Sequence, residues 1–266
     1  MAALTHTEPR PFRRAEASSR AAHWFAGIAA ALLALGTAIL VIAGYFGRDP
    51  YRWYPAAVHG QAQSGMRPPL VAVYWSGDMG MALGNGRPIV RRLNALGVPV
   101  LVVTSPTLFA TARDRGFVDS AVAASIRKAL TVSGAQKVAV IGGSFGADIV
   151  GTGLGRLPPD LRAKVSSAVL LVPETEVYFH ADPFRLAYSG PVSADPEHTV
   201  PLLRGLPLTC IYGTEETHSL CPQPFLRTAR RVAIPDGHMM IWRHADSVQA
   251  VADAVLSPPA PFGGSR

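Results

Sequence analysis

The feature that most constrains the fold is the segment 138–146, Val-Ala-Val-Ile-Gly-Gly-Ser-Phe-Gly, where a short apolar run ends in the pattern Gly-x-Ser-x-Gly. In this pattern a buried strand turns sharply into a helix, and the serine is presented on the strained turn between them. The apolar run supplies the strand, and residues 147–154 supply the helix. Gly142 and Gly146 let the strand and the helix approach closely. We therefore predict that Ser144 is a nucleophile exposed above the edge of a sheet.

The rest of the chain alternates apolar strands with helices. We expect strands at 69–75, 98–104, 138–141, 167–172, 206–212 and 231–234, and helices at 89–96, 118–130, 147–154 and 245–256. Because the strands are unbroken apolar runs, they indicate an α/β fold with a mainly parallel sheet and helices on both faces. Residues 174–199, with their aromatic, proline and acidic residues, interrupt this rhythm and are expected over the carboxyl ends of the strands. With the serine motif, the pattern resembles that of the α/β-hydrolases.

An apolar segment without a charged residue covers residues 24–46. It is long enough to cross a hydrocarbon layer of roughly 30 Å. Four arginines precede it, Arg10, Arg13, Arg14 and Arg20, and favour a cytoplasmic N-terminus with the remainder translocated. We expect an uncleaved signal anchor, with a cleaved signal peptide and a buried core helix as the alternatives. Aromatic residues expected at the membrane interfaces are Trp24, Tyr45, Phe46, Tyr51, Trp53 and Tyr54.

The chain divides into five predicted parts. They are a cytoplasmic basic tail (1–23), a transmembrane anchor (24–46), a linker (47–66), an α/β-hydrolase domain (67–256) and a disordered tail (257–266). The formal charge is +7, and the basic tail contributes +2 of it (four Arg, two Glu), so the exported part carries +5. Such a surface is attracted to anionic lipid headgroups. Nucleic-acid binding is not expected, because no clustered basic helix or recognised motif is present.

The catalytic partners of the serine are sought in the chain order serine, acid, histidine. Glu215 and Glu216 follow a late strand, and we expect Glu216 to be the acid, with Glu215 as the alternative. His238 follows the last strand and is the expected base, while Asp236 is a weaker candidate for its partner. Nε2 of His238 would take the proton of Ser144, and Glu216 would hold the tautomer of the imidazole.

An oxyanion hole is expected from the backbone N–H of Phe145 and from that of Asp78 or Met79, which lie in the loop after the first strand of the domain. The carboxylate of Asp78 cannot stabilise an oxyanion. We therefore expect it either to accept a cationic group of the substrate or to order its own loop.

The two cysteines of the chain, Cys210 and Cys221, flank the loop that carries the two glutamates. In an oxidising compartment they are expected to form a disulfide, and two buried free thiols are the alternative. Two cysteines are too few for a metal site, and no glycine-rich phosphate motif follows the first strand, so no metal or organic cofactor is expected.

Four segments together resemble the VirJ/AcvB virulence-protein family. They are 74–80 (Tyr-Trp-Ser-Gly-Asp-Met-Gly), 141–148 (Ile-Gly-Gly-Ser-Phe-Gly-Ala-Asp), 210–216 (Cys-Ile-Tyr-Gly-Thr-Glu-Glu) with Cys221-Pro222, and 235–238 (Pro-Asp-Gly-His). The resemblance covers about residues 69–256 and implies an exported bacterial α/β-hydrolase-like protein that hydrolyses lysyl-phosphatidylglycerol. The chain departs from the family pattern at Met79, Gly143 and His218, which bears on substrate preference more than on mechanism.

These observations predict a serine hydrolase with a single-pass anchor in the bacterial inner membrane and its catalytic domain in the periplasm. It would cleave the aminoacyl ester of lysyl-phosphatidylglycerol, or of a similar lipid, through an acyl-enzyme. Asp78 and Glu215 are the acids expected near a substrate ammonium. One alternative is a non-catalytic accessory protein of the cell envelope or of type IV secretion machinery, and another is a carboxylesterase for small soluble esters. The expected partners are the aminoacylated phospholipid and the membrane, and the sequence identifies no protein partner.

Overall fold

The computed structural model describes residues 13–56 and 68–264, with side chains from residue 23 onward. The chain forms two compact units, one up to Leu40 and one from Val41 onward. The first unit consists mainly of helix α1 (Arg13–Ala43), of which His23–Ala43 is long and apolar enough to span a membrane. Its described side chains are mostly exposed, unlike those of a core helix. Residues 1–12 of the predicted basic tail lie outside the described residues.

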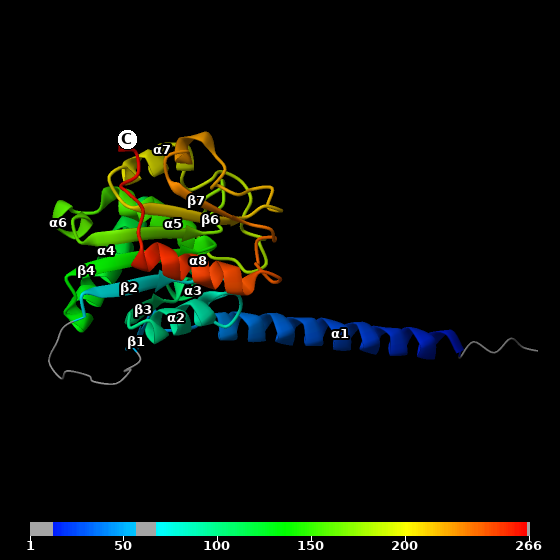
Figure 1. Cartoon of the computed structure of the whole chain (residues 1–266). Coiled ribbons are helices and arrows are strands. Elements are labelled where there is room, and N and C mark those ends of the chain that lie inside the picture. The colour runs from blue at the N-terminus through cyan, green and yellow to red at the C-terminus, as the bar shows by residue number, and fades with distance from the viewer. Residues whose placement is uncertain (1–12, 57–67, 265–266) are drawn as a thin grey trace, which may run out of the picture. The chain divides into compact units, whose positions relative to one another are not determined.

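The second unit is built on a sheet that has, in the described part of the chain, seven strands in the order β1-β3-β2-β4-β5-β6-β7 (Figure 1). The strands are β1 (Tyr51–Tyr54), β2 (Leu70–Trp75), β3 (Val100–Val103), β4 (Lys137–Gly143), β5 (Val165–Leu171), β6 (Leu208–Gly213) and β7 (Arg230–Ile234). Only β1 runs antiparallel to its neighbour. Strands β2 to β7 correspond to the six predicted strands, so the mainly parallel α/β sheet is confirmed.

Helices cover both faces of this sheet. Helices α2 (Gly86–Ala95) and α8 (His244–Leu256) pack on one face, and α4 (Arg115–Ser133) and α5 (Phe145–Gly153) on the other. Shorter elements are α3 (Ser105–Phe109), α6 (Pro159–Arg162), α7 (Pro196–Thr199), η1 (Leu154–Arg156), η2 (Val200–Leu203) and η3 (Pro224–Leu226). The strands read as unbroken apolar runs because both of their faces are buried under helices.

The carboxyl ends of the parallel strands meet at one edge of the sheet, where ligands bind in such folds. The loops 76–80, 214–219 and 235–243 leave β2, β6 and β7 at this edge. The segment between β5 and α7 is tied to the same place, because Thr175 N–H donates to the carbonyl of His218 at 3.0 Å. The expectation that this segment lies over the carboxyl ends agrees with the structure.

The predicted linker 47–66 is partly a strand, which corrects the predicted start of the domain. Tyr51–Tyr54 forms β1 and pairs with β3, which would otherwise be the sheet edge. An edge strand presents unpaired N–H and C=O groups, and β1 satisfies them. The compact unit therefore begins at Val41 rather than at residue 67. Residues 57–66 of the predicted linker lie outside the described residues.

Several aromatic residues predicted at membrane interfaces belong to the folded domain instead. Tyr45, Tyr51 and Trp53 pack against the hydrophobic core on the α4 and α5 side of the sheet, and Tyr54 packs on the opposite side. Large aromatic rings bury much apolar area when they pack at the edge of the sheet that β1 forms, which explains this placement. Phe46 remains 67% exposed.

The residues after α8 are folded against the domain, which corrects the prediction of a disordered tail at 257–266. Phe262 is only 2% exposed and belongs to the hydrophobic core. Its N–H donates to the carbonyl of Leu206, and its carbonyl accepts from the N–H of Gly205, both at 2.8 Å. One buried ring and two main-chain hydrogen bonds thus order a segment rich in proline and glycine. Residues 265–266 lie outside the described residues.

Candidate active site

Ser144 lies on a sharp turn between β4 and α5. Its φ of 52° and ψ of −126° are unusual for a residue with a side chain. The turn is held because the N–H of Ser144 donates to the carbonyl of Leu171 at 2.8 Å. A Cβ atom on Gly142 would overlap the carbonyl oxygen of Gly146, and one on Gly146 would overlap that of Trp75. Both glycines are therefore needed for the close approach of strand and helix, as the motif indicates.

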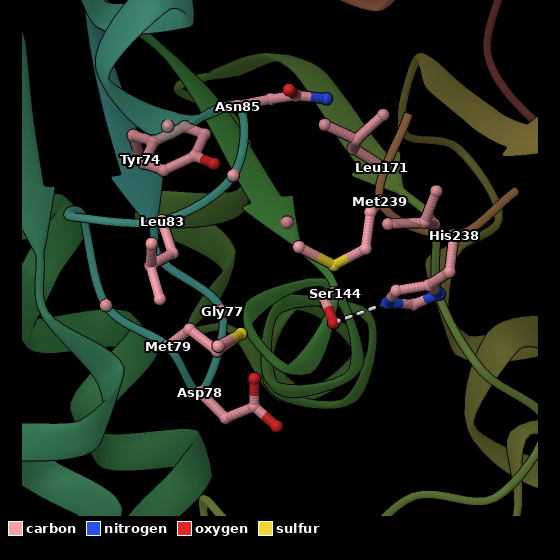
Figure 2. A pocket seen from close by; sticks show the side chains of 15 residues that line it. Tyr74, Gly77, Asp78, Met79, Leu83, Asn85, Ser144, Leu171, His238 and Met239 are labelled. Carbon is pink, nitrogen blue, oxygen red and sulfur yellow. Dashed lines mark hydrogen bonds between the residues drawn. The ribbon is translucent and has the colours of Figure 1, made fainter. Parts of the chain in front are cut away.

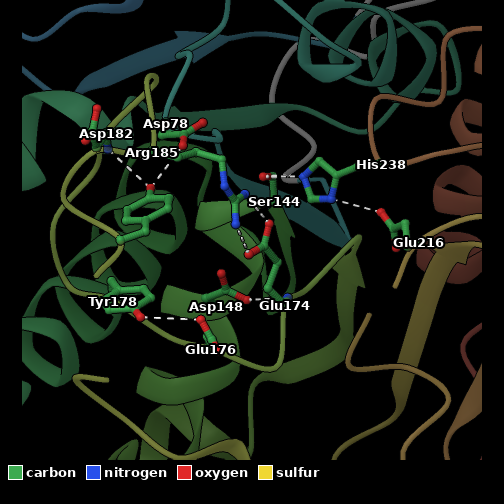
Figure 3. A network of polar contacts seen from close by, with 11 residues as sticks. Asp78, Ser144, Asp148, Glu174, Glu176, Tyr178, Asp182, Arg185, Glu216 and His238 are labelled. Atoms are coloured by element: carbon green, nitrogen blue, oxygen red, sulfur yellow. Dashed lines mark hydrogen bonds and ion pairs between the residues drawn. The ribbon is translucent and has the colours of Figure 1, made fainter. Parts of the chain in front are cut away.

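The side chains of Ser144, His238 and Glu216 lie in series at the carboxyl edge of the sheet (Figure 3). Oγ of Ser144 is 2.8 Å from Nε2 of His238, and Nδ1 of His238 is 2.9 Å from Oε1 of Glu216. The Glu216 side chain is 6% exposed, and its Oε2 has no hydrogen-bond partner among the described residues. This carboxylate therefore faces the imidazole, and the series can move a proton from the serine to the histidine.

The environment of His238 favours the protonated imidazole. Burial disfavours the charged ring, but the hydrogen bond and the charge of Glu216, together with the charge of Glu174, outweigh it. The net effect raises the pKa of His238 above its ordinary value. An imidazolium formed during proton transfer from Ser144 is thus stabilised where it forms.

The two other acids weighed as partners of His238 lie elsewhere. Glu215 is exposed, and its N–H donates to the carbonyl of Asp236 at 3.2 Å. The carboxylate of Asp236 accepts three backbone N–H groups, from Gly237, Trp242 and Arg243, at 2.7–2.8 Å. Asp236 therefore shapes the loop that carries His238, and in the described part of the chain its carboxylate makes no hydrogen bond to the imidazole.

The loop that carries Glu216 is closed by the predicted disulfide. Cys210 and Cys221 are bonded, with Cα atoms 5.5 Å apart, and both are fully buried. Cys210 lies in β6, and Cys221 follows the loop. The covalent link holds the two ends of the loop together, so the disulfide prediction is confirmed and the free-thiol alternative is not.

The predicted oxyanion donors surround Ser144. Phe145 is the first residue of α5, and an N–H in the first turn of a helix has no partner within the helix. Across from it, a Cβ atom on Gly77 would lie 3.4 Å from Cβ of Ser144, so the loop 76–80 closely approaches the serine. Asp78 and Met79 follow in this loop and line the same pocket as Ser144 (Figure 2). Their role in stabilising an oxyanion stays a prediction.

One side of Ser144 opens into a pocket of about 70 Å³, which we call the apolar pocket (Figure 2). Its larger side chains are those of Tyr74, Met79, Leu83, Asn85, Leu171, Val172 and Met239. Gly143, just before the serine, also lines it, and a Cβ atom there would lie 2.8 Å from the hydroxyl of Tyr74. The absence of a side chain at this position therefore leaves room beside the nucleophile.

The other side of Ser144 borders a smaller pocket of about 10 Å³, which we call the acidic pocket (Figure 3). It is lined by Asp78, Ser144, Phe145, Asp148, Glu174, Glu176, Tyr178, Arg185 and Tyr188. Four carboxyl groups thus face one arginine within reach of the serine. Asp78 lines both pockets, and Glu215, predicted to contact substrate, is absent from the residues that line either one.

Hydrogen bonds hold the acidic pocket together. Arg185 makes a bidentate pair with Glu174, at 2.6 and 2.9 Å. Tyr188 donates its hydroxyl to Oδ2 of Asp78 at 3.0 Å, and the N–H of Glu174 donates to Oδ1 of Asp148 at 3.0 Å. These bonds connect the loop after β2, the first turn of α5 and the segment after β5.

The carboxyl groups of this pocket differ in their preferred charge. Burial raises the pKa of Asp148 well above its usual range, and burial also raises the pKa of Asp78, against the opposing hydrogen bond from Tyr188. For Glu174, burial is outweighed by the pairing with Arg185, and its pKa is lowered. A cation entering the pocket would meet Asp78 as a partly buried carboxyl group that forms no salt bridge with the other described residues.

Sequence reasoning did not single out Glu174, Glu176, Arg185 or Tyr188. The available signal was the acidic and aromatic composition of residues 174–199, which placed the segment near the site without assigning a role to any of its side chains. Within the part of the chain that the structure describes, no group of three or more His, Cys, Asp or Glu side chains is arranged as a metal site.

Comparisons with known proteins give a family and a fold. The family model described as "Bacterial virulence protein (VirJ)" matches residues 69–258. No curated protein matches the sequence.

Among solved structures, similar folds occur in esterases and hydrolases. Est1E from Butyrivibrio proteoclasticus with ferulic acid bound is 12% identical, with a TM-score of 0.56, over 78% of this chain and 94% of that chain. The esterase Pf2001 from Pyrococcus furiosus is 16% identical, with a TM-score of 0.52, over 71% and 83%. An α/β serine hydrolase homologue from Coxiella burnetii is 11% identical, with a TM-score of 0.52, over 77% and 90%. At such identities the likeness establishes the α/β-hydrolase fold alone.

Proposed function

The chain belongs to the VirJ family of bacterial virulence proteins, and on this premise we propose that it is a serine hydrolase that cleaves the aminoacyl ester of lysyl-phosphatidylglycerol or a similar aminoacylated lipid. The observation that carries the proposal is the series Ser144, His238 and Glu216, whose serine borders both the acidic pocket and the apolar pocket. The series supplies a nucleophile and a base. Of the two pockets beside the serine, one suits a cationic group and the other suits an apolar group.

In the proposed first step, Oγ of Ser144 attacks the ester carbonyl while Nε2 of His238 takes the hydroxyl proton. The carbonyl oxygen becomes an oxyanion and accepts hydrogen bonds from the N–H of Phe145 and from that of Asp78 or Met79. The tetrahedral intermediate then collapses, the glycerol oxygen leaves with the proton from His238, and the aminoacyl group remains on the serine. Water, deprotonated by His238, attacks this acyl-enzyme and releases the amino acid and the free serine.

The two pockets support an aminoacylated lipid as the substrate. The aminoacyl side of the ester carries one or two ammonium groups, and the acidic pocket offers carboxyl groups in excess of its single arginine. The lipid side is larger and less polar, which matches the apolar pocket. Asp78 borders both pockets beside Ser144, so its carboxylate is the group that we expect to receive an ammonium next to the scissile ester.

A membrane location is part of the proposal. The candidate span His23–Ala43 supports a single-pass anchor, and the basic residues before it favour export of the catalytic domain to the periplasm. The Cys210–Cys221 disulfide suits such an oxidising compartment. An anchored enzyme meets a lipid substrate at a high effective concentration without further contacts.

The proposal is tested with the full chain reconstituted in vesicles that contain lysyl-phosphatidylglycerol, by measuring released lysine. We expect Ser144→Ala to lower the rate by about 10⁴-fold or more, because the serine and histidine act as one unit. Ser120→Ala, an exposed serine on α4, is the matched control and should leave the rate unchanged.

Two other results would contradict the proposal and point to the alternatives. Serine-dependent cleavage of a soluble chromogenic ester, without lysine release, would indicate a carboxylesterase for small esters. A chain inert toward both substrates would indicate a non-catalytic accessory protein on a hydrolase scaffold.

A further inference from the structure

The loop after β7 is held by hydrogen bonds and presents two large apolar side chains to solvent. Met240 is fully buried at a φ of 50°, while the neighbouring Ile241 and Trp242 are 67% and 86% exposed. The three backbone N–H bonds to Asp236 close the loop behind them. The exposure of these side chains is therefore imposed by the fold of the loop and is not a consequence of a loosely packed segment.

The same loop also contributes an exposed apolar side chain to the candidate active site. Met239, one residue before the buried Met240, lines the apolar pocket and is 44% exposed, and Leu83 lines the same pocket and is 45% exposed. We call Leu83, Met239, Ile241 and Trp242 the apolar rim. Three of these four exposed side chains lie within four residues of one loop, and a cluster of large exposed apolar side chains next to a pocket is typical of an interaction surface.

The candidate membrane span ends beside the same pocket. Ala43, its last residue, is 2% exposed, and its carbonyl lies so close to Gly80 that a Cβ atom there would overlap it. Next, the hydroxyl of Tyr45 donates to the carbonyl of Asp78 at 3.1 Å. All these residues belong to the compact unit that begins at Val41. The point where the chain would leave the bilayer is therefore fixed against the loop 76–80, which lines the apolar pocket.

We propose that the apolar rim docks on the surface of the bilayer that holds the anchor, so that the apolar pocket opens toward the lipid. This inference rests on the membrane anchor of the proposed function. Tryptophan and other large apolar side chains prefer the headgroup region, and the cationic Arg243 directly follows Trp242. Because His238 lies in the same loop, the docked rim holds the catalytic base at the depth of a headgroup ester, and a lipid substrate reaches Ser144 without leaving the bilayer.

Docking is tested directly by fluorescence quenching in proteoliposomes of phosphatidylglycerol and phosphatidylethanolamine, made with and without brominated acyl chains. The full chain carries bimane on Trp242→Cys or, as the matched control, on Val132→Cys, an exposed apolar position near the end of α4. The two native cysteines are joined and buried, so only the new thiol reacts. We expect strong quenching at position 242 and little at 132. Equally weak quenching at both positions, as for a rim that binds a second copy of the chain, would overturn the proposal.

A kinetic experiment separates docking from catalysis. Ile241→Ser combined with Trp242→Ser should lower hydrolysis of the bilayer-embedded ester by about tenfold or more, because two large side chains lose their burial in lipid. Hydrolysis of a soluble ester should stay within about twofold. An unchanged rate on the bilayer-embedded ester would refute docking. If the unmodified chain shows no Ser144-dependent activity, the proposed function fails, while the quenching result still decides whether the rim meets the membrane.

Discussion

Replacing Asp78 by asparagine tests whether the charge of the acidic pocket selects the substrate. The change removes one negative charge and keeps the shape of the side chain. Oδ2 of Asp78 accepts the hydroxyl of Tyr188 at 3.0 Å, and the amide oxygen of an asparagine can accept the same bond. The carbonyl of Asp78, which accepts from Tyr45, is unaffected. The variant therefore changes charge with little change in packing.

The size of the effect follows from the state of each acid in the pocket. The charge of Glu174 is balanced by Arg185. Burial raises the pKa of Asp148 well above its usual range; burial also raises the pKa of Asp78, but the hydrogen bond from Tyr188 opposes it. Asp78 and Glu176 remain to meet a cation, and Asp78 is the one that also borders the apolar pocket. A hydrogen bond to a charged group contributes about 1.5–3 kcal/mol. Asp78→Asn should thus lower kcat/KM for a cationic substrate by about 10- to 150-fold.

The assay compares two water-soluble nitrophenyl esters, one of lysine and one of acetate, with the full chain in detergent. We expect kcat/KM to fall for the lysine ester and to stay within about twofold for the acetate. Asp160→Asn, an exposed acid on α6, controls for the change in net charge. An equal loss of kcat/KM on both esters would mean that Asp78 only orders the loop 76–80. No loss of kcat/KM on either ester would mean that the charge of Asp78 does not contribute to binding of a cationic substrate. Both results would refute the reasoning.

Three further predictions concern the catalytic series and its support. The value of kcat/KM for a soluble ester should rise with pH through the pKa of His238, because the neutral imidazole is the base. Burial lowers this pKa, but the effects of Glu216 and Glu174 outweigh burial, so the midpoint of the pH profile should lie above 6.5. A midpoint below 6.5 would contradict the assignment of His238 as the base. Glu216→Gln should lower kcat by about 10⁴-fold and move the midpoint of the pH profile downward. Glu215→Gln should leave kcat and the midpoint nearly unchanged. If Glu215→Gln had the larger effect, Glu215 would be the acid of the series. Joint replacement of Cys210 and Cys221 by alanine should lower the free energy of unfolding, measured by urea titration, by about 3 kcal/mol. This magnitude is the chain-entropy value for a disulfide across 11 residues. A change below about 1 kcal/mol would show that the loop is held by its packing alone.

The sequence located the candidate catalytic series because each of its members lies within four residues of the end of a strand whose apolar run is visible. Ser144 follows β4, Glu216 lies three residues after the end of β6, and His238 follows β7. Parallel strands bring their carboxyl ends to one edge, so three positions distant in the chain become neighbours by the topology alone. The choice of Glu216 over Glu215 agrees with the geometry, since only Glu216 contacts the imidazole.

Other features depend on contacts that local patterns do not encode. The local pattern predicts a linker at Tyr51–Tyr54 because this strand is short and its partner β3 lies far along the chain. The proline and glycine residues around Phe262 predict a disordered tail, because such a composition does not indicate that a single ring is buried. Both errors come from the same cause, since a short segment is stabilised by what it packs against more than by its own preference.

The sequence by itself determined the parallel sheet, the serine turn, the candidate span and the partners of the serine. It could do so because these follow from hydrophobic periodicity and from glycines at fixed spacing, which act within a few residues. Only the tertiary structure decided the acidic pocket and the apolar rim. The pocket depends on pairs such as Tyr188 and Asp78, which are 110 residues apart. The rim depends on a loop whose backbone is held by the carboxylate of Asp236. The acidic pocket and the apolar rim form where loops that are distant in the chain pack together at one edge of the sheet. Hydrophobic periodicity within a segment does not predict how such loops pack.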